Sequence, residues 1–276
     1  MPELPEVEIV CRGLSAVMEG RRLTAVRLMR PDLRQPFPPG FVERLENRRI
    51  VRITRRAKYM TLFVDSGWVV LIHLGMSGHL KVGRRESLSP AKHDHVIFDT
   101  DDGQRVVFHD ARRFGLMDLV AEDRLADHPL LARLGPEPLD DTFTPAILSA
   151  ALAGRPGPIK PLLLDQTVVA GLGNIYASEA LFRAGIHPTR AAARVAGARA
   201  RRLVPAIKSV LTEAIAAGGS TLRDHRQPNG ELGYFQHSFA VYDREGKPCP
   251  GCVCTESVRR LVQSGRSTFF CAKRQR

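Results

Sequence analysis

The hydrophobic periodicity of this sequence changes along the chain, and this change limits the folds open to it. Residues 23–120 contain short β-branched or aromatic runs separated by turn residues, which is typical of antiparallel strands. Beyond residue 145 the runs are rich in Ala and Leu and have a helical composition. The segment 128–145 is rich in Pro and acidic residues and has no clear period. We therefore predict an α+β protein of two domains joined by this segment.

The first domain is expected to begin with a helix and to continue as an antiparallel β-sandwich. Apolar residues recur at helical spacing over 7–18, and Gly20 follows as a suitable helix C-cap. The runs Val96-Ile97-Phe98 and Val106-Val107-Phe108 flank Asp102-Gly103, which is a hairpin signal. The predicted boundaries are 1–127 for the sandwich domain, 128–145 for the linker, 146–238 for a helical domain and 239–276 for a C-terminal hairpin.

Basic residues outnumber acidic ones: 41 Lys and Arg against 29 Asp and Glu give a formal net charge of +12. This balance favours a polyanionic partner, with nucleic acid as the leading candidate, although a solubilising surface has the same composition. No apolar run reaches the roughly 18 to 20 residues of a membrane span, and the N-terminus is acidic where a signal peptide is basic. We therefore expect a cytoplasmic protein without a membrane segment.

Four of the five cysteines lie within the last 28 residues, and this clustering favours a metal site. They are Cys249, Cys252, Cys254 and Cys271, set among strand-like runs that are typical of a small metal-clipped hairpin. A disulfide framework is disfavoured in a reducing cytosol. Cys11 stands alone on the apolar face of the first helix, and we interpret it as a small buried hydrophobic residue.

Pro2 provides an unusual nucleophile if Met1 is removed, because the new N-terminus is a secondary amine. An α-amino group titrates near ~7.7–8.0 and Lys near ~10.4, so the terminal amine is more available as a nucleophile by about two orders of magnitude. Attack on a sugar C1′ would give an iminium ion directly, and this ion favours elimination at C2′. Glu3 and Glu6 lie in the same first turn. They either complement the helix dipole or transfer protons.

The sequence Met1-Pro-Glu-Leu-Pro-Glu-Val-Glu8 resembles the signature of the formamidopyrimidine-DNA glycosylases. Motifs similar to those of this family continue in the same order along most of the chain. Those of the first half are Arg56-Ala57-Lys58-Tyr59, His73-Leu-Gly-Met-Ser-Gly78, Lys92-His-Asp-His-Val96, Asp110-Ala-Arg-Arg-Phe-Gly115 and Leu134-Gly-Pro-Glu-Pro-Leu139. Those of the second half are Lys160, Leu164-Asp-Gln166, Gly171-Leu-Gly-Asn-Ile-Tyr176, Gly218-Gly-Ser-Thr-Leu-Arg-Asp224 and Val241-Tyr242.

The resemblance implies a catalytic group at the N-terminus. Pro2 corresponds to the nucleophile, and Glu3 corresponds to the acid that assists opening of the deoxyribose or departure of the base. Glu6 is assigned to the same group, and Lys58 corresponds to a catalytic cation that also contacts phosphate. Without the resemblance, Lys58 would be interpreted as the solvated end of a basic strand.

The resemblance also implies residues that contact DNA around a lesion. Met76, Arg112 and Phe114 correspond to residues that fill the gap left by an extruded nucleotide, and His93 is assigned to the same DNA-binding surface. From side-chain type alone, Met76 and Phe114 would be core residues.

In the second half, Lys160 and Asn174 correspond to phosphate contacts of a helix-two-turn-helix element. A glycine turn followed by Asn174 is by itself an ordinary helix start. Ser220–Asp224 corresponds to a loop that closes over an extruded oxidised purine. Arg266 corresponds to the arginine that reaches phosphate from the C-terminal hairpin.

The resemblance implies a zinc finger with two Cys-x-x-Cys pairs, but this chain departs from that pattern. Arg274 stands three residues after Cys271, where the family has its fourth cysteine. Cys254 has the family spacing to Cys271, whereas Cys252 is two residues out of register. Zinc could be bound by the four cysteines of the segment, or the hairpin could keep its shape by packing alone.

The resemblance implies a monomeric enzyme of base excision repair that acts on double-stranded DNA with oxidised bases or abasic sites. Its expected activity is that of a bifunctional glycosylase and AP lyase, which removes 8-oxoguanine and formamidopyrimidines through a Schiff base and β,δ-elimination. Two alternatives stay open. One is an endonuclease VIII-type enzyme for oxidised pyrimidines, which typically has Gly where this chain has Leu4. The other is a lesion-binding protein without catalysis.

Overall fold

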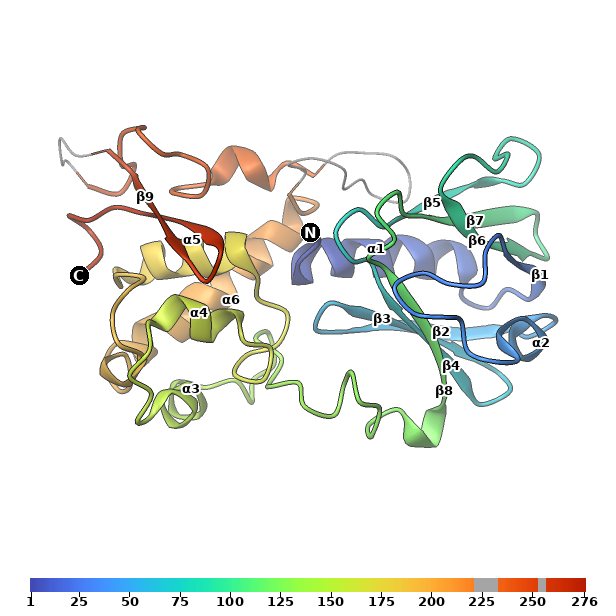
Figure 1. The fold of residues 1–276 in the computed structure, drawn as a ribbon, viewed down its shortest axis with the longest axis horizontal. Helices are drawn as coiled ribbons and strands as arrows, with labels where there is room; N and C mark the ends of the chain where they lie inside the picture. Colours follow the sequence, from blue (N-terminus) through green and yellow to red (C-terminus); the bar gives the residue numbers. More distant parts are fainter. Residues whose placement is uncertain (221–232, 253–256) are drawn as a thin grey trace. The chain divides into compact units, whose positions relative to one another are not determined.

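The computed structural model describes residues 1–220, 233–252 and 257–276 of the chain. The chain forms two compact units, which we describe separately (Figure 1). The first consists of Met1–Ala132 with Ala217–Tyr234, and the second consists of Arg133–Ala216 with Phe235–Arg276. Residues 217–220 and 233–234 therefore belong to the first unit, although they lie within the predicted helical domain 146–238. Among the described residues, the structure contains no helix that is long and apolar enough to span a membrane.

The first unit contains α1 (Leu4–Met18) and two four-stranded antiparallel sheets. One sheet has the order β1-β6-β7-β5, with β1 at Leu23–Leu28, β5 at His79–Arg84, β6 at Asp94–Thr100 and β7 at Gln104–His109. The other has the order β2-β3-β4-β8, with β2 at Ile50–Arg56, β3 at Tyr59–Val64, β4 at Trp68–His73 and β8 at Leu116–Ala121. Two short elements complete this unit, α2 (Phe41–Leu45) and η1 (Glu122–Arg124).

The two sheets and α1 share one hydrophobic core, which confirms the predicted sandwich. Val10 from α1, Met60 from β3 and Phe98 from β6 all belong to this buried cluster. Figure 1 shows α1 running beside both sheets. Cys11 is buried on the same helix, and burial raises the pKa of its thiol to about 12. This thiol is therefore a packing group, as the sequence predicts.

The second unit is mainly helical. It contains α3 (Pro145–Leu152), α4 (Ile159–Leu164), α5 (Asn174–Ala184), α6 (Ala200–Ala216), and the short turns η2 (Ala192–Arg194) and η3 (Phe235–Ser238). Pro205 lies inside α6, in the interior of the helix and not at its start. Leu203, Val204 and Ile207 are buried on both sides of it. Their packing outweighs the loss of about 3 kcal/mol that an interior proline causes.

The chain ends in an antiparallel hairpin of β9 (Arg259–Gln263) and β10 (Arg266–Phe270). Glu179 on α5 fixes the segment that leads toward this hairpin. Its carboxylate is fully buried and accepts the backbone N–H groups of Ala240, Val241 and Tyr242 at 3.0, 2.9 and 2.8 Å. A buried charge with three such donors is compensated, and removing it leaves three amides without a partner.

We expect Glu179→Gln to lower the free energy of unfolding by about 2 kcal/mol or more, because the new NH2 group would face a backbone donor instead of accepting from it. Urea unfolding followed by circular dichroism measures this change. Glu213→Gln is the matched control, because Glu213 forms a surface ion pair with Arg183 at 2.6 Å. Its removal is expected to cost less than about 1 kcal/mol. Equal effects of the two variants would contradict the structural role given to Glu179.

Candidate catalytic and nucleic-acid-binding residues

The N-terminus of the first unit is fixed by Glu6. Pro2 and Glu3 are buried directly before α1, whereas Met1 is exposed. One carboxylate oxygen of Glu6 accepts the backbone N–H of Glu3 at 2.8 Å, and the other accepts the backbone N–H of Ser220 at 2.8 Å. Glu6 therefore joins the first turn of α1 to a segment more than two hundred residues away.

Two glycines allow the Ser220 backbone to approach the Glu6 carboxylate closely. Gly219 has a φ of +79°, and a Cβ there would lie 3.3 Å from the Glu6 Oε1 atom. At Gly233 a Cβ would lie 2.3 Å from the carbonyl oxygen of Gly219. A side chain at either position would displace the Ser220 backbone from Glu6. The rest of the predicted lesion-closing loop, residues 221–224, lies outside the described residues.

Lys58 lies in the two-residue turn between β2 and β3, where Ala57 has a φ of +54°. The side chain is only 7% exposed, so the interpretation of a solvated strand end is wrong. Arg55 supports this turn by donating to the Ala57 carbonyl at 3.0 Å and to Glu8 of α1 at 2.9 Å. Burial opposes ionisation of Glu8, but hydrogen bonds from Arg55 and Arg12 lower its pKa. The ion pair therefore anchors the Lys58 turn to α1.

His73 is a residue of this site that was not predicted from the sequence, although it is the first residue of the motif at 73–78. It ends β4 opposite Tyr59, and the two rings are 4.9 Å apart. Its Nδ1 accepts the backbone N–H of Gly75 at 2.9 Å. Burial, together with the positive charges of Lys58 and Arg34, lowers the pKa of His73 to about 4. His73 is therefore a neutral imidazole at neutral pH, close enough to Lys58 to be affected by its charge.

Met76, Arg112 and Phe114 lie on two adjoining loops of the first unit. The Met76 and Phe114 side chains are 41% and 45% exposed, so the interpretation of core residues is wrong. The Arg112 guanidinium lies 4.8 Å from the centre of the Phe114 ring. The loops touch through their backbones, because a Cβ on Gly75 would lie 2.4 Å from the Phe114 carbonyl carbon. The three side chains expected to fill a gap in DNA thus form one exposed group.

Asp110 organises these two loops from beneath. It is fully buried, and its carboxylate accepts the Ser77 hydroxyl at 2.5 Å and the Gly115 backbone N–H at 2.7 Å. The predicted DNA-contacting residue His93 has a φ of +72°, and its carbonyl accepts the Asp110 backbone N–H at 3.0 Å. The imidazole Nε2 of His95 lies 2.8 Å from the Asp110 carbonyl oxygen. Asp110 therefore positions both loops, a role that its place in the Asp110–Gly115 motif did not indicate.

In the second unit, Lys160 and Asn174 come together with the C-terminal hairpin. Lys160 is 1% exposed, and its Nζ donates to Asn174 Oδ1 at 2.6 Å, Thr268 Oγ1 at 2.7 Å and the Ser267 carbonyl at 3.0 Å. Asn174 is the first residue of α5, and its Nδ2 also donates to the Ser267 carbonyl at 2.9 Å. Arg266 is exposed at the start of β10, directly before these acceptors. The start of α5 and the start of β10 are thus held side by side.

Three of the four C-terminal cysteines form a cluster that could hold a metal. The ligand atoms of Cys249, Cys252 and Cys271 all lie within 4.8 Å of one another, with Sγ–Sγ distances of 3.4 Å from Cys252 to Cys249 and 3.7 Å from Cys252 to Cys271. Thiolates around a tetrahedral zinc ion are about 3.8 Å apart, from a Zn–S distance of about 2.3 Å. Cys252 joins the cluster although its spacing is out of register. Cys254 lies outside the described residues.

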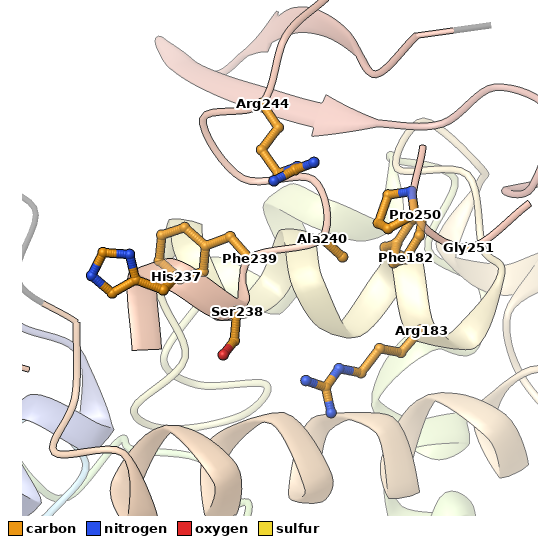
Figure 2. A pocket seen from close by; sticks show the side chains of 9 residues that line it. All are labelled: Phe182, Arg183, His237, Ser238, Phe239, Ala240, Arg244, Pro250 and Gly251. Carbon is orange, nitrogen blue, oxygen red and sulfur yellow. The ribbon is translucent and has the colours of Figure 1, made fainter. Parts of the chain in front are cut away.

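A surface cavity of about 440 Å³ lies elsewhere in the second unit (Figure 2). It is lined by Phe182, Arg183, Phe239, Arg244 and Gly251 among others. None of the residues predicted for catalysis or DNA contact lines it.

Comparison of the sequence with known proteins identifies one family for both halves of the chain. Sequence profiles of the "Formamidopyrimidine-DNA glycosylase N-terminal domain" and the "Formamidopyrimidine-DNA glycosylase H2TH domain" match residues 1–117 and 134–226. Proteins named formamidopyrimidine-DNA glycosylase from Rhodospirillum rubrum and Acidiphilium cryptum are 59% and 58% identical to this chain, over all of both sequences. The chain belongs to the formamidopyrimidine-DNA glycosylase family.

Solved structures of the family have the same fold. The MutM (Fpg) protein of Thermus thermophilus has a TM-score of 0.88 and 41% identity, covering 99% of this chain and 98% of that one. The Lactococcus lactis Fpg in complex with DNA containing N7-benzyl-Fapy-dG has a TM-score of 0.90 and 30% identity, covering 99% of both chains. The predicted α+β class with a sandwich and a helical domain is confirmed.

The low pKa of His73 predicts a pH-dependent loss of stability. In the unfolded chain this histidine takes up a proton near pH ~6.5, whereas the folded protein resists protonation down to about pH 4. The free energy of unfolding should therefore fall as the pH drops through this interval, by on the order of 2–3 kcal/mol from this group alone. Comparing urea unfolding of the wild type and His73→Asn across the interval isolates the effect, because Asn can still accept from Gly75. Parallel pH profiles would contradict the prediction.

Proposed function

We propose that this protein is a base excision repair enzyme that excises oxidised purines, such as 8-oxoguanine and formamidopyrimidines, from double-stranded DNA and then cleaves the strand. Membership of the family supports the overall activity. The observation that carries the residue assignments is the N-terminal arrangement: Pro2 and Glu3 are buried at the start of α1 and are fixed there by Glu6. A terminal residue is normally poorly ordered unless other groups hold it.

The proposed reaction starts from the chain without Met1. The Pro2 amine attacks C1′ of the damaged nucleotide, and the bond between C1′ and the base breaks with its electron pair going to the base, which is protonated. Glu3 donates a proton to O4′ as the sugar ring opens, and the amine nitrogen, having lost its own proton, forms an iminium ion with C1′. Loss of a C2′ proton then expels the 3′ phosphate, and a second elimination releases the 5′ phosphate.

Lys58 and its neighbours suit a role beside the reacting sugar. The proposed function of Lys58 is to supply a positive charge near the phosphate and to take part in proton transfer. Neutral His73 near Lys58 avoids a second charge in the same buried region, and the Arg55–Glu8 pair holds the turn in place. In this proposal the Glu6 carboxylate positions the N-terminus through its two backbone hydrogen bonds.

The remaining assigned residues would bind the DNA around the lesion. Exposed Met76 and Phe114 are proposed to fill the gap in the stack, and Arg112 to bond the orphaned partner base. His93 is proposed to contact the backbone near the lesion. Asn174 and Arg266 are proposed phosphate donors in the second unit. Lys160 was expected to contact phosphate, but it is buried with three acceptors, and its proposed role is therefore to add positive charge beneath these donors.

The metal proposed for the cysteine cluster is zinc. The buried thiols of Cys249 and Cys271, with Cys252, offer the soft sulfur ligands and the spacing that zinc accepts. When bound, zinc would supply a structural cross-link at the base of the hairpin. The cysteine residues would thereby hold the hairpin of β9 and β10 beside the start of α5. Arg266, at the start of β10, would be held in place with the hairpin.

Borohydride trapping tests the catalytic proposal. We expect a covalent adduct with duplexes that contain 8-oxoguanine or an abasic site, because the iminium ion is reduced to a stable amine. Pro2→Gly is expected to abolish base excision while leaving lesion binding largely intact. Excision and binding are measured on the same duplexes by gel assay.

Two results would change the assignment. Absence of any adduct would leave only the lesion-binding alternative, and a preference for thymine glycol would move the activity to oxidised pyrimidines. Equal loss of binding and excision in Pro2→Gly would mean that Pro2 is a structural residue.

Arg266 provides a separate test of the DNA-contacting surface. Arg266→Ala should weaken binding to all duplex sequences and reduce the slope of log K against log salt by about 1, because one phosphate contact is lost. Arg124→Ala is the charge-matched control, since Arg124 is an exposed arginine of the first unit. The affinities are measured by fluorescence anisotropy at several salt concentrations. An unchanged slope for Arg266→Ala would contradict the contact.

A further inference from the structure

Arg274 occupies the sequence position at which the proposed zinc finger would have its fourth cysteine. It lies three residues after Cys271, in the second of the two turns that carry the cysteines. The first turn contains Cys249, Gly251 and Cys252. In a four-thiolate site, the metal joins the two turns through ligands from both. Here an arginine side chain links them directly.

The Arg274 side chain makes three contacts outside its own turn. Its Nη1 donates to the Gly251 carbonyl at 2.5 Å, and its Nε donates to the Phe182 carbonyl at 3.3 Å. The guanidinium carbon lies 4.9 Å from the centre of the Phe182 ring. Arginine suits this position because its planar group can donate in two directions and stack on an aromatic ring at the same time. We call Arg274, Phe182 and Gly251 the Arg274 clip.

Gly251 leaves room for this clip because it has no side chain. A Cβ at this position would lie 2.7 Å from Phe182 Cζ and 3.0 Å from Arg274 Nη1. Figure 2 shows Gly251 and Pro250 next to the Phe182 ring. A side chain at residue 251 would therefore separate the first cysteine turn from both other members of the clip.

The last residues of the chain extend the same attachment to the end of α5. The buried side chain of Gln275 accepts the Cys271 backbone N–H at 2.8 Å and donates to the Ile186 carbonyl at 2.9 Å. The Arg276 backbone N–H donates to the Gly185 carbonyl at 3.1 Å. The second cysteine turn is thus bound to protein groups at residues 274, 275 and 276.

We infer that Arg274 takes over the structural task of the thiolate that the family pattern has at this position, so that the second cysteine turn stays attached to the first turn and to α5 without bound metal. The cysteine thiols then form a separate site, whose metal adds to an attachment that already exists. This inference rests on the proposed zinc site only for the effect of added zinc. The attachment itself follows from the Arg274 clip.

Hydrogen exchange of the C-terminal peptide, measured by mass spectrometry, tests the inference in the full-length protein. With a chelator present, residues 271–276 of the wild type should keep their protection. Arg274→Ala should increase their exchange rate about tenfold, because two hydrogen bonds and a stacking contact are lost. Lys273→Ala is the matched control: it removes an exposed positive charge from the neighbouring residue and should leave exchange unchanged.

The variant Arg274→Cys distinguishes the effect of the arginine on hydrogen exchange from the effect of the metal. This variant restores the family pattern, so its protection should be low in chelator and should recover when zinc is added. Zinc content, measured by competition with a chromophoric chelator, gives a second readout that does not depend on activity. Wild-type protein that binds no zinc would contradict the proposed metal site but not the Arg274 clip.

Two outcomes would overturn the inference. In the first, Arg274→Ala has the same protection as the wild type in chelator. In the second, the chelated wild type loses protection to the level of Arg274→Ala, which would mean that the metal and not the arginine holds the turn.

Discussion

The structure depends on one constraint: the nucleophile proposed at residue 2 requires an N-terminus that is fixed, although chain ends are usually the least ordered part of a protein. Glu6 meets this requirement with two backbone hydrogen bonds, one to Glu3 and one to Ser220. The helix that carries Glu6 is itself held by the core of the sandwich and by the ion pair between Glu8 and Arg55. Since Arg55 also supports the Lys58 turn, one helix positions the proposed nucleophile and the proposed cation together.

Local pattern was sufficient to predict most of the fold. The runs Val96-Ile97-Phe98 and Val106-Val107-Phe108 lie in β6 and β7 as predicted, and Asp102-Gly103 correctly marked the turn between these strands. These features depend on neighbours in sequence, which is why periodicity finds them. Pro205 shows the limit of such rules, because tertiary packing of α6 overrides the preference of a single residue.

The candidate site was less predictable, because its geometry depends on contacts between distant segments. The exposure of Met76 and Phe114 results from the two loops that buried Asp110 holds, and side-chain type alone predicts the opposite. Nothing in the local sequence indicates that Glu6 bonds Ser220, or that His73 lies near Lys58. The family resemblance pointed to many of these positions, whereas only the structure shows the groups that hold them.

In the inference drawn for the C-terminal segment, an arginine replaces one metal ligand of the family pattern while the hairpin is kept. A thiolate contributes to such a site mainly by connecting two turns, and a guanidinium can make the same connection through carbonyl oxygens. Replacing a thiolate by an arginine also makes the local charge more positive by about two units, which suits a surface near DNA phosphates. Because Gln275 and Arg276 already attach the second turn to α5, the arginine has to supply only the link to Gly251. The register of β10, and with it the position of Arg266, can therefore be kept by hydrogen bonds as well as by a metal.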